Sequence, residues 1–301
     1  SWLLYAVQTN DFVEAMCQLV QGALYPAVRP KDICAYPIPL PPVDVQRRLV
    51  AEIEKQFTRL EAGIAALHRV QANLKRYRAA VLKGACEGRL VPTEAELASK
   101  ERCAYESADK LLARILAERR EKWTGRGKYR EPTAPDTKHL PLLPEGWTIA
   151  SVDQLSSHIT SGSRDWSQFY GRGTGTFILA QNVRPMRLDL SEPQTVDAPI
   201  GDAGTERTRV ALNDILVTIV GAKTGDVCRV PAELREHFVC QSVALLRPIF
   251  GGLAKFAELY LASPENGQAR WNRYIYGQGR PHLSFEQLRM TAIPLPPLAE
   301  Q

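Results

Sequence analysis

A repeat at an offset of 255 residues constrains the architecture of this chain more than any other feature. Residues 22–46 and residues 277–301 each begin with Gly, carry Pro four positions later, continue with Ile-Pro-Leu-Pro-Pro and end with Gln, without a gap. Solenoids repeat every ~20–50 residues, so copies this far apart imply two large homologous modules instead. We therefore expect residues 1–42 to be the C-terminal tail of a first module, with a second module further along the chain.

The first copy is followed by the pattern of a long amphipathic helix. Between positions 49 and 81, apolar residues recur every three or four positions, as in a coiled-coil seam, and only Gly63 interrupts them. Gly84 and Gly88 mark the expected end. We predict a central spacer helix over 43–90 that packs against a partner helix; the alternative is a helix packed on its own domain. The predicted seam residues are Ile53, Phe57, Leu60, Ile64, Leu67, Leu74 and Val81.

Residues 91–142 have the composition of a helical and basic linker. An amphipathic helix is predicted over roughly 108–123, and the stretch 119–130 carries six cations. Such a run either contacts phosphate or is a solvated linker, and both interpretations remain open.

The pattern changes again from residue 143. Short apolar runs, such as 215–220, alternate with turns rich in Gly and Asn, which favours β-strands. One helix is predicted over 253–274. We interpret 143–297 as a mixed α/β module and 298–301 as the start of a second spacer helix.

Composition narrows the range of functions and partners. The net charge of +5 permits a polyanionic partner without requiring one. The six cysteines form no C-x-x-C pair and the five histidines are dispersed, which predicts free thiols in a reducing compartment and no metal site. Neither a long apolar run nor a basic leader is present. We therefore expect a cytoplasmic protein with no membrane partner.

With these features in view, the chain resembles the specificity (S) subunit of type I restriction-modification systems over essentially its whole length. The most specific segment is the Pro-rich run 37–42, continued by 46–53 and 74–78, which resembles the central spacer region of that family. Residues 143–147 resemble the usual entry into a target-recognition domain, and residues 279–301 resemble its usual exit.

The resemblance implies two target-recognition domains in tandem, each followed by a long helix, with the two helices antiparallel. Each domain would read one half of a bipartite site in double-stranded DNA, and the helices would set the distance between the halves. The implied partners are DNA, methyltransferase (modification) subunits and an endonuclease (restriction) subunit. Catalysis would belong to those subunits, so we expect no catalytic residue, metal or cofactor here. The chain departs from the family plan at both ends, and we expect a fragment.

Three loops of 143–297 carry the residue types that contact DNA. Arg, Lys, Asn and Gln read base edges, and cations anchor on phosphates. These types gather in 161–182, 221–225 and 277–282, and the resemblance places similar segments near DNA. For any single residue, the alternative is an ordinary exposed side chain. The residues predicted to contact DNA are Ser163, Arg164, Arg172, Gln181, Asn182, Lys223, Thr224, Gln278, Arg280 and His282.

Two other functions compete with this one. Residues 169–173 fit the F-x-G-x-G loop of S-adenosylmethionine-dependent methyltransferases, but polar residues precede them and neither Pro-Pro pair follows Asn or Asp. Loop 221–225 lacks the Gly-Lys-Ser/Thr ending of a phosphate-binding loop. A coiled-coil assembly scaffold with incidental DNA contact is the other alternative. Salt-dependent DNA binding distinguishes a DNA reader from a scaffold.

Overall fold

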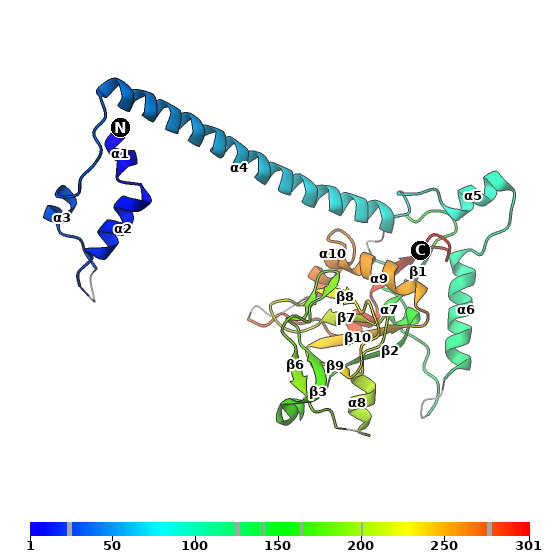
Figure 1. The fold of residues 1–301 in the computed structure, drawn as a ribbon. Helices are drawn as coiled ribbons and strands as arrows, with labels where there is room; N and C mark the ends of the chain where they lie inside the picture. The colour runs from blue at the N-terminus through cyan, green and yellow to red at the C-terminus, as the bar shows by residue number, and fades with distance from the viewer. Residues whose placement is uncertain are drawn as a thin grey trace. The chain divides into compact units, whose positions relative to one another are not determined.

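The computed structural model describes residues 1–22, 26–123, 127–138, 140, 142–162, 165–199, 201–275 and 279–301. These residues form two compact units, Ser1–Lys75 and Arg76–Gln301, which we describe separately (Figure 1).

The first unit consists of helices. The short helices α1 (Trp2–Ala6), α2 (Asn10–Gln18) and α3 (Pro30–Cys34) bury none of their residues. A few contacts hold α1 to the rest of the unit: the Trp2 indole donates to the Pro39 carbonyl at 3.0 Å, and the rings of Tyr5 and Phe57 lie 5.9 Å apart. Contacts of this kind, without a buried core, leave most of the apolar surface of the unit in water.

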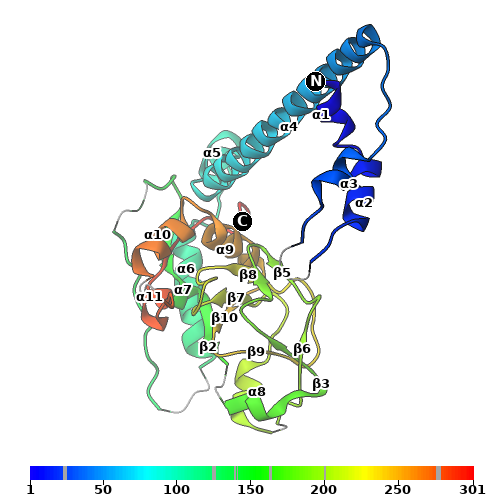
Figure 2. The ribbon, with the colours of Figure 1, turned by 90° about the vertical axis from the view of Figure 1, so that its left-hand side faces the viewer.

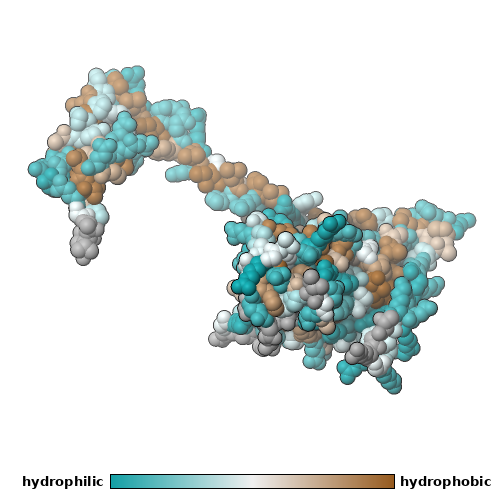
Figure 3. Space-filling model, turned by 60° about the horizontal axis from the view of Figure 1, so that its bottom comes forward, coloured by the Kyte–Doolittle hydropathy of each residue, from teal (hydrophilic) through white to brown (hydrophobic). Residues whose placement is uncertain are grey.

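The predicted long helix is confirmed as α4 (Val43–Cys86), which continues from the first unit into the second. Its 44 residues span about 66 Å at a rise of about 1.5 Å per residue. Apolar residues run along its length (Figure 3). Most of the predicted seam is exposed, with Leu67 at 71%. A helix that leaves such a stripe in water fits the expectation of a partner helix.

Two sheets form the body of the second unit. The four-stranded sheet is antiparallel throughout and has the order β2 (Ser156–Ser161), β10 (Val243–Pro248), β7 (Ile215–Thr218) and β8 (Val227–Arg229). The three-stranded sheet has the order β6 (Gln194–Val196), β3 (Tyr170–Ile178) and β9 (His237–Val239), with β3 and β9 parallel. Two small pairs complete the strands: β1 (Thr148–Ser151) with β11 (Ala292–Leu295), and β4 (Val183–Arg184) with β5 (Arg187–Leu188).

The four-stranded sheet is buried on both faces. Val217 and Leu246 belong to one hydrophobic cluster, with α6 and α9, whereas Leu216 and Leu245 belong to a second cluster, with Phe177 of the other sheet. Because successive side chains of a strand point to opposite faces, a strand covered on both sides must be apolar throughout. This burial explains why the run at 215–220 lacks polar alternation.

Helices cover one side of this core. They are α6 (Ala108–Glu121), α7 (Val152–Leu155), α9 (Gly252–Ala262), α10 (Gly267–Tyr274) and α11 (Phe285–Arg289); α5 (Glu94–Glu101) and α8 (Ala203–Thr208) lie elsewhere in the unit, as does a 3-10 turn at Asp165–Phe169. The segment expected as a linker contributes to the core itself, since Leu111 and Ile115 of α6 are fully buried.

The prediction of a single helix over 253–274 is wrong, because the chain forms two helices there. Pro264 follows Ser263, which disfavours helical backbone at the break. A Cβ on Gly267 would lie 2.5 Å from the Leu261 Cα, so only glycine allows α10 to return this closely to α9.

The secondary structure follows the sequence repeat. At the offset of 255, α3 (Pro30–Cys34) and α11 (Phe285–Arg289) coincide end to end. The Gln46 amide donates to the Pro41 carbonyl at 2.7 Å, and Gln301 donates to Pro296 at 2.9 Å. Burial differs between the copies: Leu295 is fully buried, whereas the corresponding Leu40 is 83% exposed. The second copy of the Pro-rich stretch is therefore packed into the core of its unit, whereas the first copy is not covered by its own unit.

Candidate nucleic-acid interface

Several loops meet at one end of the four-stranded sheet. Beyond β7, the backbone continues so that Val220 pairs with His282 in an antiparallel bridge. The Gly221 amide donates to the Pro281 carbonyl at 3.0 Å, and the Leu283 amide donates to Ile219 at 2.9 Å. We call the segments Ser161–Gly162, Gly221–Gly225, Gln241–Ser242 and Arg280–His282 the loop cluster. Two of the three loops singled out in the sequence are thus joined through their backbones.

The Gly221–Gly225 loop is held by a tight hydrogen-bond network. The Thr224 hydroxyl lies 2.7 Å from the Gly221 carbonyl and 2.9 Å from the Pro281 carbonyl, and can donate to either. The Gly225 amide donates to Thr218 at 2.8 Å, and the Gln268 side chain of α10 donates to the Gly225 carbonyl at 2.8 Å. Gly221 has a φ of +110°, which favours glycine. The loop backbone is therefore fixed while Lys223 points outward, exposed.

Gly162 fixes the other side of the cluster. Its amide donates to the Cys240 carbonyl at 3.1 Å. A Cβ at this position would lie 1.9 Å from the Val239 carbonyl oxygen, a distance that no side chain tolerates. The end of β2 is consequently pressed against the chain that connects β9 to β10, which sets the width of the cleft between them.

A cleft of about 620 Å³ lies within the loop cluster. Its polar rim includes Gln241, Arg280 and His282, and Phe285 and Ile219 contribute apolar wall. A guanidinium, an amide and an imidazole around one hollow can donate to base edges and to phosphate oxygens. This is the chemistry of a nucleic-acid contact.

The structure separates the predicted DNA-contacting residues into groups. Lys223, Arg280 and His282 lie together in the loop cluster, with the first two exposed and the third half-buried. Thr224 turns its hydroxyl toward backbone carbonyls, so it braces the loop. Arg172 and Gln181 are exposed but do not line the cleft. Ser163, Arg164 and Gln278 lie outside the described residues.

Asn182 is placed differently from what its residue type suggested. It is 3% exposed, its side-chain oxygen accepts from the Leu179 amide at 2.9 Å, and its side-chain nitrogen donates to the Asp189 carbonyl at 2.9 Å. Both ends of the amide are used to close the turn after β3. Asn182 is therefore left out of the proposed interface.

Sequence reasoning missed Gln241. This residue is exposed, lines the cleft and follows the buried strand β9, in the same way that Lys223 follows β7. The available signal was an amide directly after the apolar run 238–240. No spacing pattern connects it to residues 221–225 or 280–282, because the fold alone brings them together.

An acidic side chain modulates the charge beside Lys223. Burial raises the pKa of the Asp226 carboxyl, and the positive charges of Lys223 and Arg184 partly offset that rise. The buried thiols nearby are poor nucleophiles, since burial raises the pKa of Cys228 to about 12 and also raises the pKa of Cys240. Within the described residues, no group of three or more His, Cys, Asp or Glu is placed to hold a metal ion.

Comparison with known proteins finds one domain match and a distant relative. Residues 203–301 match the type I restriction modification DNA specificity domain, and this stretch contains most of the loop cluster. The specificity subunit of the type I restriction enzyme EcoBI from Escherichia coli is 22% identical over 275 residues, which is 88% of this chain. Residues 203–301 thus match a type I DNA specificity domain, and the chain as a whole is similar to a type I specificity subunit.

One solved structure shares the fold of this chain, and a second aligns more loosely. The first comes from work on complex assembly and conformational transition of the type I restriction-modification system. It aligns with a TM-score of 0.52 and 19% identity, over 99% of this chain and 60% of that one. The HsdS subunit of Thermoanaerobacter tengcongensis aligns with a TM-score of 0.46 and 20% identity, over 99% and 58%. The chain spans about half (49%) of the curated EcoBI subunit.

The glycines of the F-x-G-x-G stretch have a structural explanation. The stretch begins β3, and the pairing of β3 with β6 shifts register between Tyr170 and Gly175. A Cβ on Gly173 would lie 2.7 Å from the Asp197 Cα. Gly173 therefore allows a close approach between the backbones of β3 and the segment after β6, next to this irregularity of the ladder.

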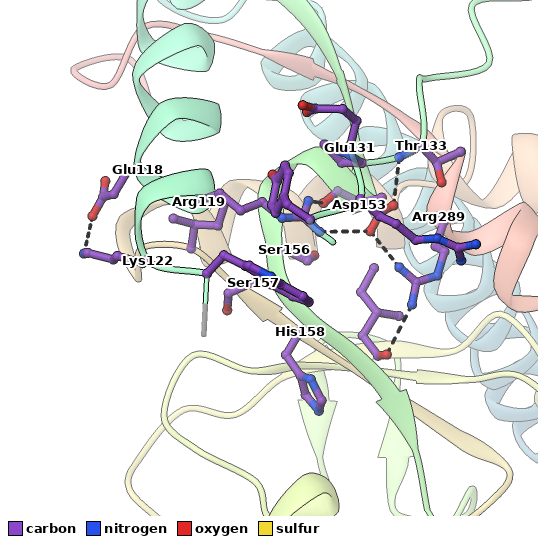
Figure 4. Close-up of a pocket in the computed structure, with 16 residues that line it drawn as sticks. Glu118, Arg119, Lys122, Glu131, Thr133, Asp153, Ser156, Ser157, His158 and Arg289 are labelled. Atoms are coloured by element: carbon purple, nitrogen blue, oxygen red, sulfur yellow. Dashed lines mark hydrogen bonds and ion pairs between the residues drawn. The ribbon is translucent and has the colours of Figure 1, made fainter. Parts of the chain in front are cut away.

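A second hollow lies around Asp153, and hydrogen bonds and ion pairs between its lining residues hold it together (Figure 4). The Asp153 carboxylate accepts from the Arg289 guanidinium at 2.7 Å and from the Thr133 amide at 2.8 Å, with Arg119 at 3.5 Å. Arg119 also donates to the Asp153 carbonyl. These bonds tie α6 and the chain at 131–133 to α7. Arg119 and Arg289 are both paired with the buried Asp153 carboxylate, so this part of the hollow has a structural role.

One further observation concerns membranes. Among the helices of the described ranges, none combines the length and the apolar composition needed to cross a bilayer.

Proposed function

We propose that this chain is a DNA sequence-recognition subunit of a type I restriction-modification complex, and that the loop cluster faces double-stranded DNA. The observation that carries the proposal is that Gln241 and Arg280 line one cleft, and that the loop exposing Lys223 is bonded to the Arg280–His282 segment through the Gly221 amide and the Pro281 carbonyl. All three residues lie within the stretch that matches the specificity-domain model. The EcoBI relative is a specificity subunit by name, which supports the same role.

The loop cluster suits DNA because it combines two kinds of contact on a rigid base. Lys223 is exposed on a turn that backbone hydrogen bonds fix, and it is suited to phosphate. Arg280 and Gln241 at the cleft are suited to guanine and adenine edges respectively. In this proposal the chain itself is non-catalytic, and methyltransferase and endonuclease subunits perform methylation and cleavage in the cytoplasm.

The remaining segments take the roles that the resemblance implies. In this proposal 1–42 is the tail of a first target-recognition domain, 43–90 is the spacer, 91–142 joins it to the second recognition domain at 143–297, and 298–301 leads into a second spacer helix. The exposed stripe on α4, including Ile64 and Leu67, packs against that partner helix. The pair of helices sets the distance between two half-sites.

The test is binding of the full chain to a mixed-sequence duplex across a salt series. Phosphate contacts release counterions, so a DNA reader loses affinity steeply as salt rises. Lys223→Ala is expected to reduce both affinity and salt slope, whereas Lys110→Ala on α6 serves as the control outside the cluster. Sequencing of methylated bases in cells that express the complete system then identifies the site. An assembly scaffold, which the exposed α4 stripe also suits, would assemble normally yet show no salt-dependent binding.

A further inference from the structure

The β4–β5 hairpin beside the loop cluster has an unusual tip. Val183 pairs with Leu188 and Arg184 with Arg187, which leaves only Pro185 and Met186 in the turn. Met186 has a φ of +58°. Residues with a Cβ rarely adopt this backbone conformation, and Gly or Asn usually occupies such a turn position. An unbranched apolar residue is therefore held where local conformation disfavours it.

The surrounding structure imposes this conformation. The Met186 amide donates to the Val227 carbonyl at 2.8 Å, and the hairpin lies against β8, as the neighbouring labels of β5 and β8 in Figure 2 show. Despite this anchoring, Met186 is 44% exposed. Burial in the core thus does not explain the side chain. Strained positions that the rest of a structure enforces are often functional.

Two arginines flank the exposed methionine. Arg187 has a side chain that is 70% exposed and paired with Asp189 at 3.1 Å, a surface contact that a stronger anion can replace. Arg184 lies close enough to Asp226 for its charge to act on that carboxyl. Asp226 directly precedes β8 and follows the Gly221–Gly225 loop. The hairpin tip is therefore continuous with the loop cluster.

We propose that the β4–β5 hairpin inserts Met186 into the minor groove of the DNA duplex as an apolar wedge, with Arg184 and Arg187 placed on the flanking phosphates and groove floor. This inference rests on the proposed function and extends it to a second element. Minor-groove proteins use apolar wedges, methionine included, to open a base step and kink the duplex, and arginines enter that narrow groove. A tip of two residues fits a groove about 6 Å wide, whereas the wider major groove accommodates a whole helix or ribbon.

Met186→Gly removes the proposed wedge side chain and is expected to leave the fold intact. Glycine adopts the positive φ without strain, so this variant is expected to fold with a melting temperature at or above that of the parent. Met186→Leu keeps an apolar wedge of similar size. Arg102→Gly is the matched control, because Arg102 is also a non-glycine residue at positive φ (+55°), and it caps α5 outside the hairpin and the loop cluster.

The experiment measures affinity and bending on one duplex. The full chain is titrated onto a duplex that carries the site found by methylation sequencing, with fluorophores at both ends so that energy transfer reports a kink. Met186→Gly is expected to weaken binding about tenfold, the size of one good contact, and to lose the kink. Met186→Leu and Arg102→Gly are expected to match the parent. Replacing guanine by inosine removes an amino group from the minor groove only, and should affect the parent but not Met186→Gly.

The outcomes separate this inference from the broader proposal. If the parent shows no salt-dependent DNA binding, the proposed function fails. If the parent binds and Lys223→Ala weakens it, while Met186→Gly binds and bends DNA like the parent, the wedge is overturned and the proposed function stands. An equal response of parent and Met186→Gly to inosine rejects the minor groove. A Met186→Gly variant that binds DNA normally but no longer assembles with methyltransferase subunits assigns the hairpin to protein docking instead.

Discussion

The Thr224 hydroxyl oxygen lies 2.9 Å from the carbonyl oxygen of Pro281 and so connects two loops that are far apart in the sequence. Together with the hydrogen bond from the Gly221 amide to the Pro281 carbonyl, this contact fixes the position of each loop relative to the other. The position of Lys223 relative to Arg280 therefore depends on a residue that does not itself face a ligand.

Removal of that hydroxyl should loosen the joined loops. Thr224→Val keeps the shape of the side chain but loses the hydrogen bond, which we expect to cost about 1 kcal/mol of unfolding free energy. DNA affinity should fall as well, because Lys223 is no longer held in place. Chemical denaturation and DNA titration measure the two effects. Thr224→Ser retains the hydroxyl and should behave like the parent; if it loses as much as Thr224→Val, the hydrogen bond is not the cause.

Lys223 and Arg280 should differ in what they contribute. Lys223→Ala should weaken binding to all sequences alike and lower the salt slope by about one, as expected for one phosphate contact. Arg280→Ala should reduce discrimination between the assigned site and a mutated site, with about 1–3 kcal/mol lost for a bidentate base contact. Competition assays with the two duplexes distinguish these patterns. Identical behaviour of the two variants would contradict the division of roles.

Asp226 predicts a pH dependence of DNA binding. Burial raises the pKa of its carboxyl, so it becomes neutral at a higher pH than an exposed aspartate does. Its negative charge opposes DNA and disappears as the pH falls through this raised pKa, so binding should strengthen on acidification. The same raised pKa costs folding stability at neutral pH, and that cost vanishes at lower pH.

Asp226→Asn provides the comparison. The variant should bind DNA more tightly than the parent at neutral pH and should be at least as stable. The ratio of the two affinities should approach one as the pH falls, and taking this ratio cancels titration of other groups that the two proteins share. A ratio that stays constant across the pH series would show that the Asp226 charge does not act on the ligand.

Two glycines should respond to alanine in opposite directions. At Gly162 a Cβ meets the Val239 carbonyl at 1.9 Å, so Gly162→Ala should destabilise the fold by about 3 kcal/mol and close the cleft. Gly84 lies within α4 and has open space around it, so Gly84→Ala should stabilise by about 0.5–1 kcal/mol. Thermal unfolding followed by circular dichroism measures both. Equal effects would mean that the crowding at Gly162 is relieved by backbone movement.

The stripe on α4 should matter for association and not for the chain's own stability. Leu67 is 71% exposed, so Leu67→Lys should change the unfolding free energy by less than about 0.5 kcal/mol. Pairing with a second spacer helix should be lost, because a charge enters the apolar seam. Sedimentation velocity of the chain with its expected partner subunits reports assembly, with Arg69→Ala as the α4 control. Normal assembly of Leu67→Lys would place the interface on another face.

Local patterns in the sequence were sufficient for elements whose stability is local. The periodicity between positions 49 and 81 and the lack of proline predicted α4, because a helix of this length is fixed by its own hydrogen bonds and spacing. The strand core at 215–218 was predictable from β-branched residues. The break between α9 and α10 was also visible in the sequence, at Pro264 and Gly267, and was missed because the apolar spacing continues across it.

The candidate site was predictable only in part, since its geometry depends on contacts between distant segments. Lys223 and Arg280 have the right chemistry in turns, and this pointed to them individually. Their proximity comes from the bridge between Val220 and His282, which no local pattern encodes. Asn182 shows the converse: an amide in a turn suggested a ligand contact, but the tertiary fold uses both of its ends.

The side chains proposed to contact DNA stand on turns that main-chain hydrogen bonds hold. Within the described part of the chain, the structure records no side-chain hydrogen bond for Lys223, Gln241 or Arg280, while main-chain groups at Gly162 and Gly221 hold the turns beneath them. Substitution at these three exposed positions should therefore carry little folding penalty. Under the proposed function, single substitutions at these positions could therefore change the recognised sequence while the fold beneath them stays the same.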